Sequence, residues 1–283
     1  MRQHPLFFFF LLAYAFSWII SIPYVLSSWG ILSSSYNLAL LLFALKYAGP
    51  TVAAIIVTSV IERKRGLLRL WHRVTLWRAG WMWYLSILVG FPSLFLLAII
   101  VQPGMLASFQ GLTRGVLLNY PLAFIATFLT IALPEEIGWR GFALPRMQPH
   151  YGPLRGTLLL GLLWGFWHLL YFLTPDHGGG LGIGAATVLV NFLIFVLLMI
   201  ALTILFTWVF NHTQGSVFIA SVLQTSFDTP QVVLIPLFLA VNETTLNLAG
   251  LIGFGVPALL IVALTRGRLG YREDLAQLQA GGD

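Results

Sequence analysis

Long apolar runs, separated by short polar segments, fill most of the 283-residue chain. A membrane hydrocarbon core of about 30 Å requires roughly 20 apolar residues in a helix. By that measure eight transmembrane helices are predicted, at residues 6–28, 37–61, 80–101, 117–142, 157–174, 184–210, 214–241 and 247–265. The seventh is the least regular, because Asp228, Pro230 and Pro236 lie in it and proline bends or breaks helices. The pattern predicts an all-α, polytopic membrane helix bundle.

The composition agrees with a membrane protein, since 59% of the residues are hydrophobic and only 8% are charged. A water-facing surface cannot be built from so few ionised groups. Disordered, coiled-coil and collagen-like chains are excluded, as are DNA-binding modules, so no nucleic-acid partner is expected. The chain has no cysteine, which excludes disulfides, thiolate metal sites and a cysteine nucleophile.

The positions of the basic residues predict the orientation. With the N-terminus inside, 13 of the 15 Lys and Arg residues fall on the inner side, while Lys46 lies within a helix and Arg114 lies outside. Positive charge is retained on the cytoplasmic side, so both termini are predicted there, with a short cytoplasmic tail at 266–283. No internal repeat or soluble segment is evident, and a single transmembrane domain, 1–283, is expected. A bacterial-type plasma membrane is the expected location.

Few ionisable residues lie within the predicted helices, where they are costly and usually face a bundle interior. They are Lys46, Glu135, Glu136, Arg140, His168 and Asp228. From a rise of about 1.5 Å per residue, Glu135 lies roughly 12 Å and His168 roughly 16 Å from the inner face, and Gln224 and Asp228 roughly 15–21 Å. Three helices therefore carry polar groups to a similar depth, which predicts one shared site.

In the predicted helix at 117–142, Glu136 and Arg140 are an i,i+4 pair that can neutralise each other. Glu135 is left without an adjacent cation, and a carboxylate in a poorly hydrated cavity suits a general base. The alternative is that both acids and Arg140 form a structural ion network. His168 could likewise be a hydrogen-bonded structural residue, and Asp228 could cap a helix break at Pro230. Lys46, which precedes Gly49 and Pro50, could be a distant counter-charge or could line a kink, and it is assigned no role.

These residues resemble the motifs of the CAAX prenyl protease and bacteriocin-processing (CPBP, or Abi) family of intramembrane proteases. Its EExxxR motif is matched by Glu135, Glu136 and Arg140. Its FxxxH motif is matched at His168, with Trp164 in place of Phe. Its HxxxN/D motif is matched only at Asp228, because Gln224 replaces the His. The resemblance covers residues 117–230.

The resemblance implies an intramembrane endopeptidase that cleaves a peptide or membrane-protein substrate near its C-terminus. Glu135 would activate a water held by His168, and Gln224 and Asp228 would stabilise the oxyanion. Glu136, Arg140 and Trp164 would support the site. In the metal-dependent view His168 would bind zinc, but Gln224 is a poor zinc ligand, so the metal is expected to be dispensable or the activity reduced.

Two other functions remain open. The first is a pseudoprotease that binds a peptide or membrane partner without cleaving it, as an immunity protein would, which the Gln224 replacement favours. The second is a transporter that uses the buried acids as a proton relay. The missing internal repeat and the absence of paired broken helices in the sequence argue against the transporter.

Overall fold

The computed structural model describes residues 1–32, 41, 43–175 and 183–273, and this part of the chain contains helices and no β-strand. Seven helical segments there are long and apolar enough to cross a membrane. They are Pro5–Ser28 (α1), Phe43–Ile61 (ending in α3, Gly49–Ile61), Trp81–Ile100 (α5, Trp81–Leu85, and α6, Phe91–Ile100), Arg114–Tyr151, Pro153–Leu173 (beginning with α10, Pro153–Trp167), Ala185–His212 (α11) and Glu243–Leu264 (α13). The predicted all-α polytopic bundle is confirmed.

The predicted span at 214–241 is wrong in its length. The helix there, α12, covers only Val217–Val233, or 17 residues, and most of its side chains are buried. The Ser216 hydroxyl caps its first turn by accepting the Ile219 N–H. Pro230 does not end the helix, which continues to Val233, and Pro236 lies in a following 3₁₀ turn. Because α6, α7 (Arg114–Thr127), α8 (Leu133–Gly138) and α11 all contact it, α12 is a central element of the bundle.

The segment Arg114–Tyr151 is one long helix with two widened turns. It consists of α7 (Arg114–Thr127), a π-helical turn (Phe128–Ala132), α8 (Leu133–Gly138), a second π-helical turn (Trp139–Ala143) and α9 (Leu144–Tyr151). Pro134 and Pro145 are the second residues of the segments that follow the two turns, and neither can donate a backbone hydrogen bond. Such π-turns often mark functional sites, and here they flank α8 on both sides.

Close helix approach fixes the position of α8 against α3. A Cβ at Gly138 would lie 2.4 Å from the Pro50 Cβ and 2.6 Å from the Pro50 carbonyl carbon, so only glycine fits there. The Thr51 hydroxyl also donates to the Pro134 carbonyl. The two contacts attach the start of α3 to both ends of α8.

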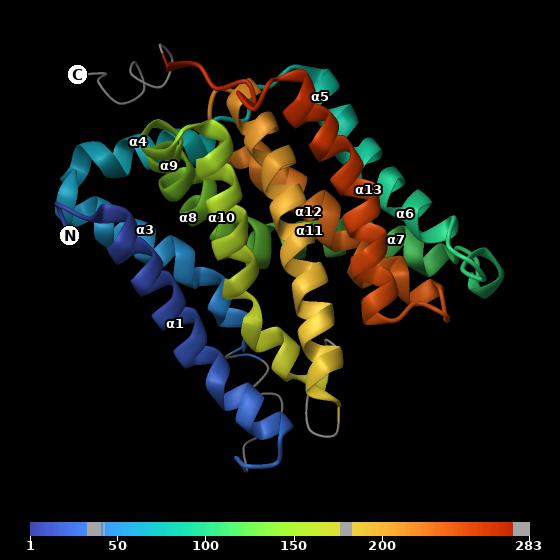
Figure 1. The fold of residues 1–283 in the computed structure, drawn as a ribbon. Coiled ribbons are helices and arrows are strands. Elements are labelled where there is room, and N and C mark those ends of the chain that lie inside the picture. The colour runs from blue at the N-terminus through green and yellow to red at the C-terminus, as the bar shows by residue number, and fades with distance from the viewer. Residues whose placement is uncertain (33–40, 42, 176–182, 274–283) are drawn as a thin grey trace.

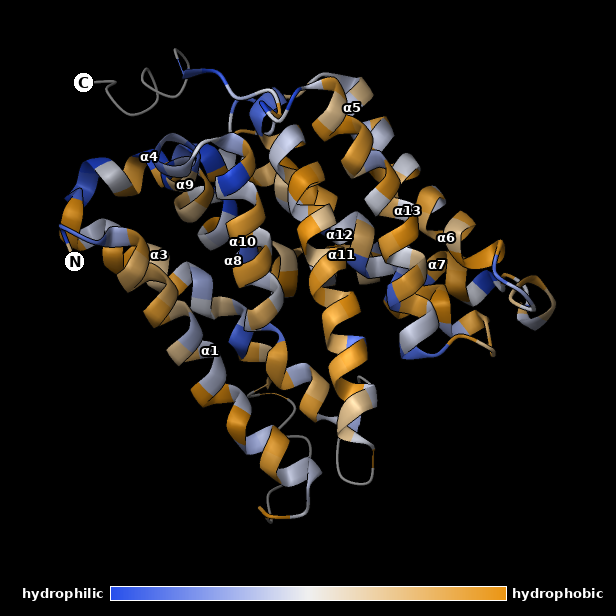
Figure 2. Ribbon diagram, in the orientation of Figure 1, coloured by the Kyte–Doolittle hydropathy of each residue, from blue (hydrophilic) through white to orange (hydrophobic). Residues whose placement is uncertain are grey.

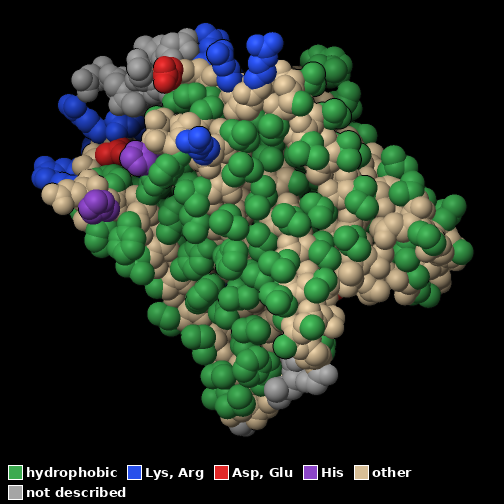
Figure 3. Space-filling view, in the orientation of Figure 1, with side chains coloured by type: hydrophobic (Ala, Val, Ile, Leu, Met, Phe, Trp, Pro, Cys, Tyr) green, Lys and Arg blue, Asp and Glu red, His purple; other side chains and the backbone are tan. Residues whose placement is uncertain are grey.

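The bundle is apolar around its sides and basic at one end. Figure 1 shows α1 and α3 on one flank, α10 and α11 in the middle and α6 and α13 on the other flank. Figure 2 shows hydrophobic residues along these helices and hydrophilic ones at the end that holds α4 (Arg63–Thr75) and α9. Lys and Arg gather at that end in Figure 3, near the N-terminus and the last described residues. That this end faces the cytoplasm stays a prediction.

Candidate active site

A cavity of about 340 Å³ lies inside the bundle and is lined by all four residues predicted to be catalytic. Glu135 comes from α8, His168 follows the last residue of α10, and Gln224 and Asp228 lie one turn apart on α12. The polar groups that the sequence placed at a similar depth on three helices therefore meet at one cavity.

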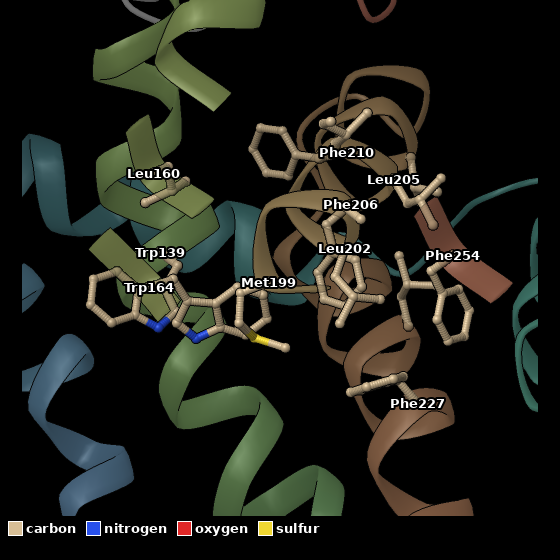
Figure 4. Packing of buried hydrophobic residues seen from close by; sticks show 14 of the residues in the cluster. Trp139, Leu160, Trp164, Met199, Leu202, Leu205, Phe206, Phe210, Phe227 and Phe254 are labelled. Atoms are coloured by element: carbon tan, nitrogen blue, oxygen red, sulfur yellow. The ribbon is translucent and has the colours of Figure 1, made fainter. Parts of the chain in front are cut away.

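The Glu135 carboxylate is held by two tryptophans. Its side chain is only 1% exposed, and its Oε2 accepts hydrogen bonds from Trp164 Nε1 at 2.7 Å and from Trp139 Nε1 at 3.2 Å. The indole rings of Trp139 and Trp164 lie side by side in the core (Figure 4). Indole N–H groups are neutral donors, so they orient the carboxylate without supplying a proton to it or a full positive charge.

The predicted pairing of Glu136 with Arg140 is confirmed. Arg140 Nη1 donates to Glu136 Oε1 at 2.5 Å, and both side chains are completely buried. The Arg140 guanidinium also lies 4.3 Å from the ring centre of Trp164 and 4.6 Å from that of Phe206. Neither residue of the pair lines the cavity, so the pair acts behind the site and orders the Trp164 ring.

The His168 ring is oriented by its own helix. His168 Nδ1 lies 2.8 Å from the Trp164 carbonyl oxygen, which can only accept, so Nδ1 is the donor. In a neutral imidazole this makes Nε2 the acceptor nitrogen. The rings of Trp167 and Phe195 pack against the imidazole at 4.7 and 5.1 Å between centres. Trp164 thus contacts both Glu135 and His168 and couples their positions.

Gln224 and Asp228, which both line the cavity from α12, are hydrogen-bonded to each other. Gln224 is buried, and its Oε1 atom has no hydrogen-bond partner in the described part of the chain. Asp228 is partly exposed at the cavity. An amide beside a carboxylate supplies N–H donors that the carboxylate alone lacks.

Two contributions to this site were missed in the sequence. Trp139 lies one helical turn after Glu135, a spacing that could have indicated it. Lys46, to which the sequence analysis assigned no role, is buried with its Nζ 2.8 Å from the Tyr171 ring centre and 4.0 Å from that of Phe43, and it interacts electrostatically with Glu135. Glu135 therefore has no cation next to it in its own helix, but the charge of Lys46 acts on it from a distant segment.

The residues at the cavity do not form a three-ligand metal site. Within the described ranges, no group of three or more His, Cys, Asp or Glu side chains is placed to hold one metal ion. Structural and catalytic zinc sites use at least three protein ligands. His168 and the nearby carboxylates do not converge in that way, so the described residues do not fit a zinc site of this kind.

Fold and site together define a class: a multi-pass integral membrane protein whose helices enclose a carboxylate, an imidazole and an amide. Comparison with known proteins is more specific. Residues 116–229 match the family described as type II CAAX prenyl endopeptidase Rce1-like. Over 101 residues the chain is 29% identical to CAAX prenyl protease 2 of Methanococcus maripaludis, a match that covers 35% of each protein. The matched part thus spans about a third of this curated relative's length.

These two findings confirm the resemblance to the CAAX prenyl protease and bacteriocin-processing family of intramembrane proteases. The matched segment contains α8, α10 and α12 up to residue 229. It therefore includes every polar residue predicted for the site.

Proposed function

We propose that this protein is an intramembrane endopeptidase that uses a glutamate-activated water. The observation that carries the proposal is the meeting of Glu135, His168, Gln224 and Asp228 at one cavity between the helices. The match of this segment to type II CAAX prenyl endopeptidases supports the reaction class. Glu135, His168 and Gln224 are buried, and a general base and aimed donors act more strongly when they are shielded from water than in bulk water.

In the proposed reaction, Glu135 removes one proton from a water molecule, while His168 Nε2 accepts a hydrogen bond from the other O–H of that water and holds it in place. The water oxygen then attacks the scissile carbonyl carbon. The Gln224 amide N–H donates to the oxyanion, while its pairing with Asp228 fixes its direction. Collapse of the tetrahedral intermediate breaks the C–N bond, and Glu135 passes the proton to the departing amine. The products are a carboxylic acid and an amine, and Glu135 is again ionised.

The proposed substrate is a peptide or membrane protein cleaved near its C-terminus. The relative from Methanococcus maripaludis is named a CAAX prenyl protease, so a prenylated CAAX peptide is the first substrate to test. The apolar exterior of the helices would allow a lipid-modified segment to approach through the bilayer.

The second candidate is a pseudoprotease with a binding or immunity role. The observation that favours it is Gln224, which occupies the position of the family's third-motif histidine. If the oxyanion is not stabilised by the amide, the same cavity would bind a peptide without cleaving it.

Cleavage of prenylated and unprenylated peptide libraries by the detergent-purified protein separates these functions. Glu135→Gln is expected to lower kcat about a thousandfold, as loss of a general base does. Glu243→Gln is the comparison variant, because it makes the same chemical change in another carboxylate at the cavity, and a much smaller loss is expected.

Gln224→His completes the test. Cleavage by the wild type that disappears in Glu135→Gln supports the protease and its base. Cleavage only by Gln224→His supports the pseudoprotease. If Glu135→Gln retains wild-type turnover, the proposed role of Glu135 is wrong.

A further inference from the structure

A second cavity, of about 430 Å³, opens at the basic end of the bundle and is not part of the site described above. Its walls come from α4, from the second π-turn and α9, from the turn between α11 and α12, and from residues 271 and 272. Among its described lining residues are four arginines, Arg69, Arg73, Arg146 and Arg272, and one acid, Glu62. The lining therefore carries a clear excess of positive charge.

Glu62 is already shared between two of these arginines. Arg69 Nη2 donates to Glu62 Oε2 at 2.5 Å, and Arg146 Nη2 donates to Glu62 Oε1. Arg73 Nη1 instead donates to the Gly141 carbonyl at 2.9 Å, and Arg146 Nη1 donates to the Phe142 carbonyl at 2.9 Å. Each guanidinium has five N–H donors, so these bonds leave donors on Arg69 and Arg73 for a further anion.

The charge balance favours an added anion. Burial, followed by the like charge of Arg146, lowers the pKa of Arg73 to about 10, and the opposing effect of Glu62 does not compensate. Arg73 is nevertheless protonated at neutral pH, so three or more guanidinium charges are held close together. A bound anion would offset their repulsion.

The composition of α4 favours a location of this cavity at the level of lipid headgroups. The helix is basic, yet Trp71 and Leu68 on it are 63% and 56% exposed. A basic helix with exposed Trp and Leu typically lies in the membrane interface, with its cationic groups near lipid phosphates. Guanidinium groups bind phosphate oxygens bidentately, which makes phosphate the best-fitting anion.

We propose that the arginine cavity is a binding site for a phosphate group, carried by an anionic phospholipid headgroup or by soluble phosphate. The site connects to the catalytic helix, because Arg73 holds the Gly141 carbonyl one turn beyond Glu136. A Cβ at Gly141 would lie 2.7 Å from Leu70 of α4, so the two elements are in direct contact. The inference does not depend on the proposed protease activity.

Native mass spectrometry of the full-length protein tests the proposal, with phosphatidylglycerol, phosphatidylcholine and inorganic phosphate as probes. Arg69→Gln/Arg73→Gln removes two cavity charges, and Lys64→Gln/Arg78→Gln removes two from positions outside the cavity lining. The probe that the wild-type protein binds most tightly is used for the comparison. Its affinity is expected to fall about tenfold in the first variant and less than twofold in the second. Preference for phosphatidylglycerol over inorganic phosphate identifies a lipid site, and the reverse preference a soluble ligand.

Equal losses in the two variants would overturn the proposal, because they would show general attraction to a basic surface. So would the absence of binding by any phosphate-bearing probe. If the cavity variant does not fold, the wild-type protein decides the question through phenylglyoxal labelling. The bound probe should then protect Arg69 and Arg73 but not Arg63, and unchanged labelling of all three would overturn the proposal.

Discussion

The two cavities of this protein hold their charged groups in different ways. In the interior cavity, Glu135 is almost completely buried and is bonded to two neutral indole donors. In the arginine cavity, Glu62 is 27% exposed and is bonded directly to two guanidinium groups. Water can screen the second arrangement but not the first. The partly exposed arginine cavity therefore tolerates an excess of cations, whereas the interior site uses neutral hydrogen-bond donors and one-to-one ion pairing.

The comparison extends to the two sets of ion pairs. Glu136 and Arg140 are fully buried and pair one to one, while Glu62 serves two partly exposed arginines. Losing one partner of a buried pair leaves a charge without compensation, and losing one partner of an exposed set leaves a solvated charge. Loss of either Glu136 or Arg140 is therefore expected to be more destabilising than loss of one residue of the Glu62 set.

The largest expected difference comes from removing one acid from each set. Glu136→Gln should lower the free energy of unfolding by about 3–5 kcal/mol, because Arg140 then stays buried without a counter-charge. Glu62→Gln should cost about 1 kcal/mol or less. Denaturant unfolding in detergent measures both values, and equal losses would contradict the contrast between the two cavities.

A smaller effect is expected from the indole donors. Trp164→Phe should lower kcat about ten- to a hundredfold, because the 2.7 Å hydrogen bond that orients Glu135 is lost. Trp139→Phe is the matched variant, and its longer 3.2 Å bond predicts a smaller loss. Steady-state cleavage assays rank the two. A larger loss in Trp139→Phe would show that Trp164 is not the main support of the carboxylate.

The pH dependence of stability should show the contribution of the ion pairs between Glu62 and the arginines of the cavity. Burial tends to raise the pKa of Glu62, but Arg146 and Arg69 outweigh it and hold the pKa below its ordinary value of 4.5. A carboxyl with a lowered pKa stabilises the folded state above pH 4.5, and this stabilisation is lost as the pH falls through the folded-state pKa. The Tm difference between wild type and Glu62→Gln should therefore be largest near neutral pH and shrink in acid. A difference that grows in acid would refute this assignment.

The smallest expected effect is that of chelators. Because the described cavity residues do not converge as three metal ligands, incubation with EDTA or 1,10-phenanthroline should change kcat by less than twofold. Activity assays before and after dialysis measure this. Loss of activity that added zinc restores would revive the assignment of His168 as a zinc ligand.

Much of the site could be predicted from short-range spacing. The Glu136–Arg140 pair follows from helix geometry, because residues four apart face the same way. The common depth of Glu135, His168 and Asp228 follows from counting residues along helices. The length of the seventh helix could not be predicted in this way, since α12 is surrounded by other helices and does not need the length of a lipid-facing span.

The sequence by itself determined the membrane-spanning class, the helical fold and the polar residues of the site, because hydrophobic length and helical period are local properties of the chain. Only the tertiary structure decided which groups surround Glu135. Lys46 and Trp164 lie 89 and 29 residues away from it along the chain. Helix packing brings Trp164 into hydrogen-bond contact with the carboxylate and lets the charge of Lys46 act on it. The arginine cavity arises in the same way, from segments whose contact no local pattern encodes.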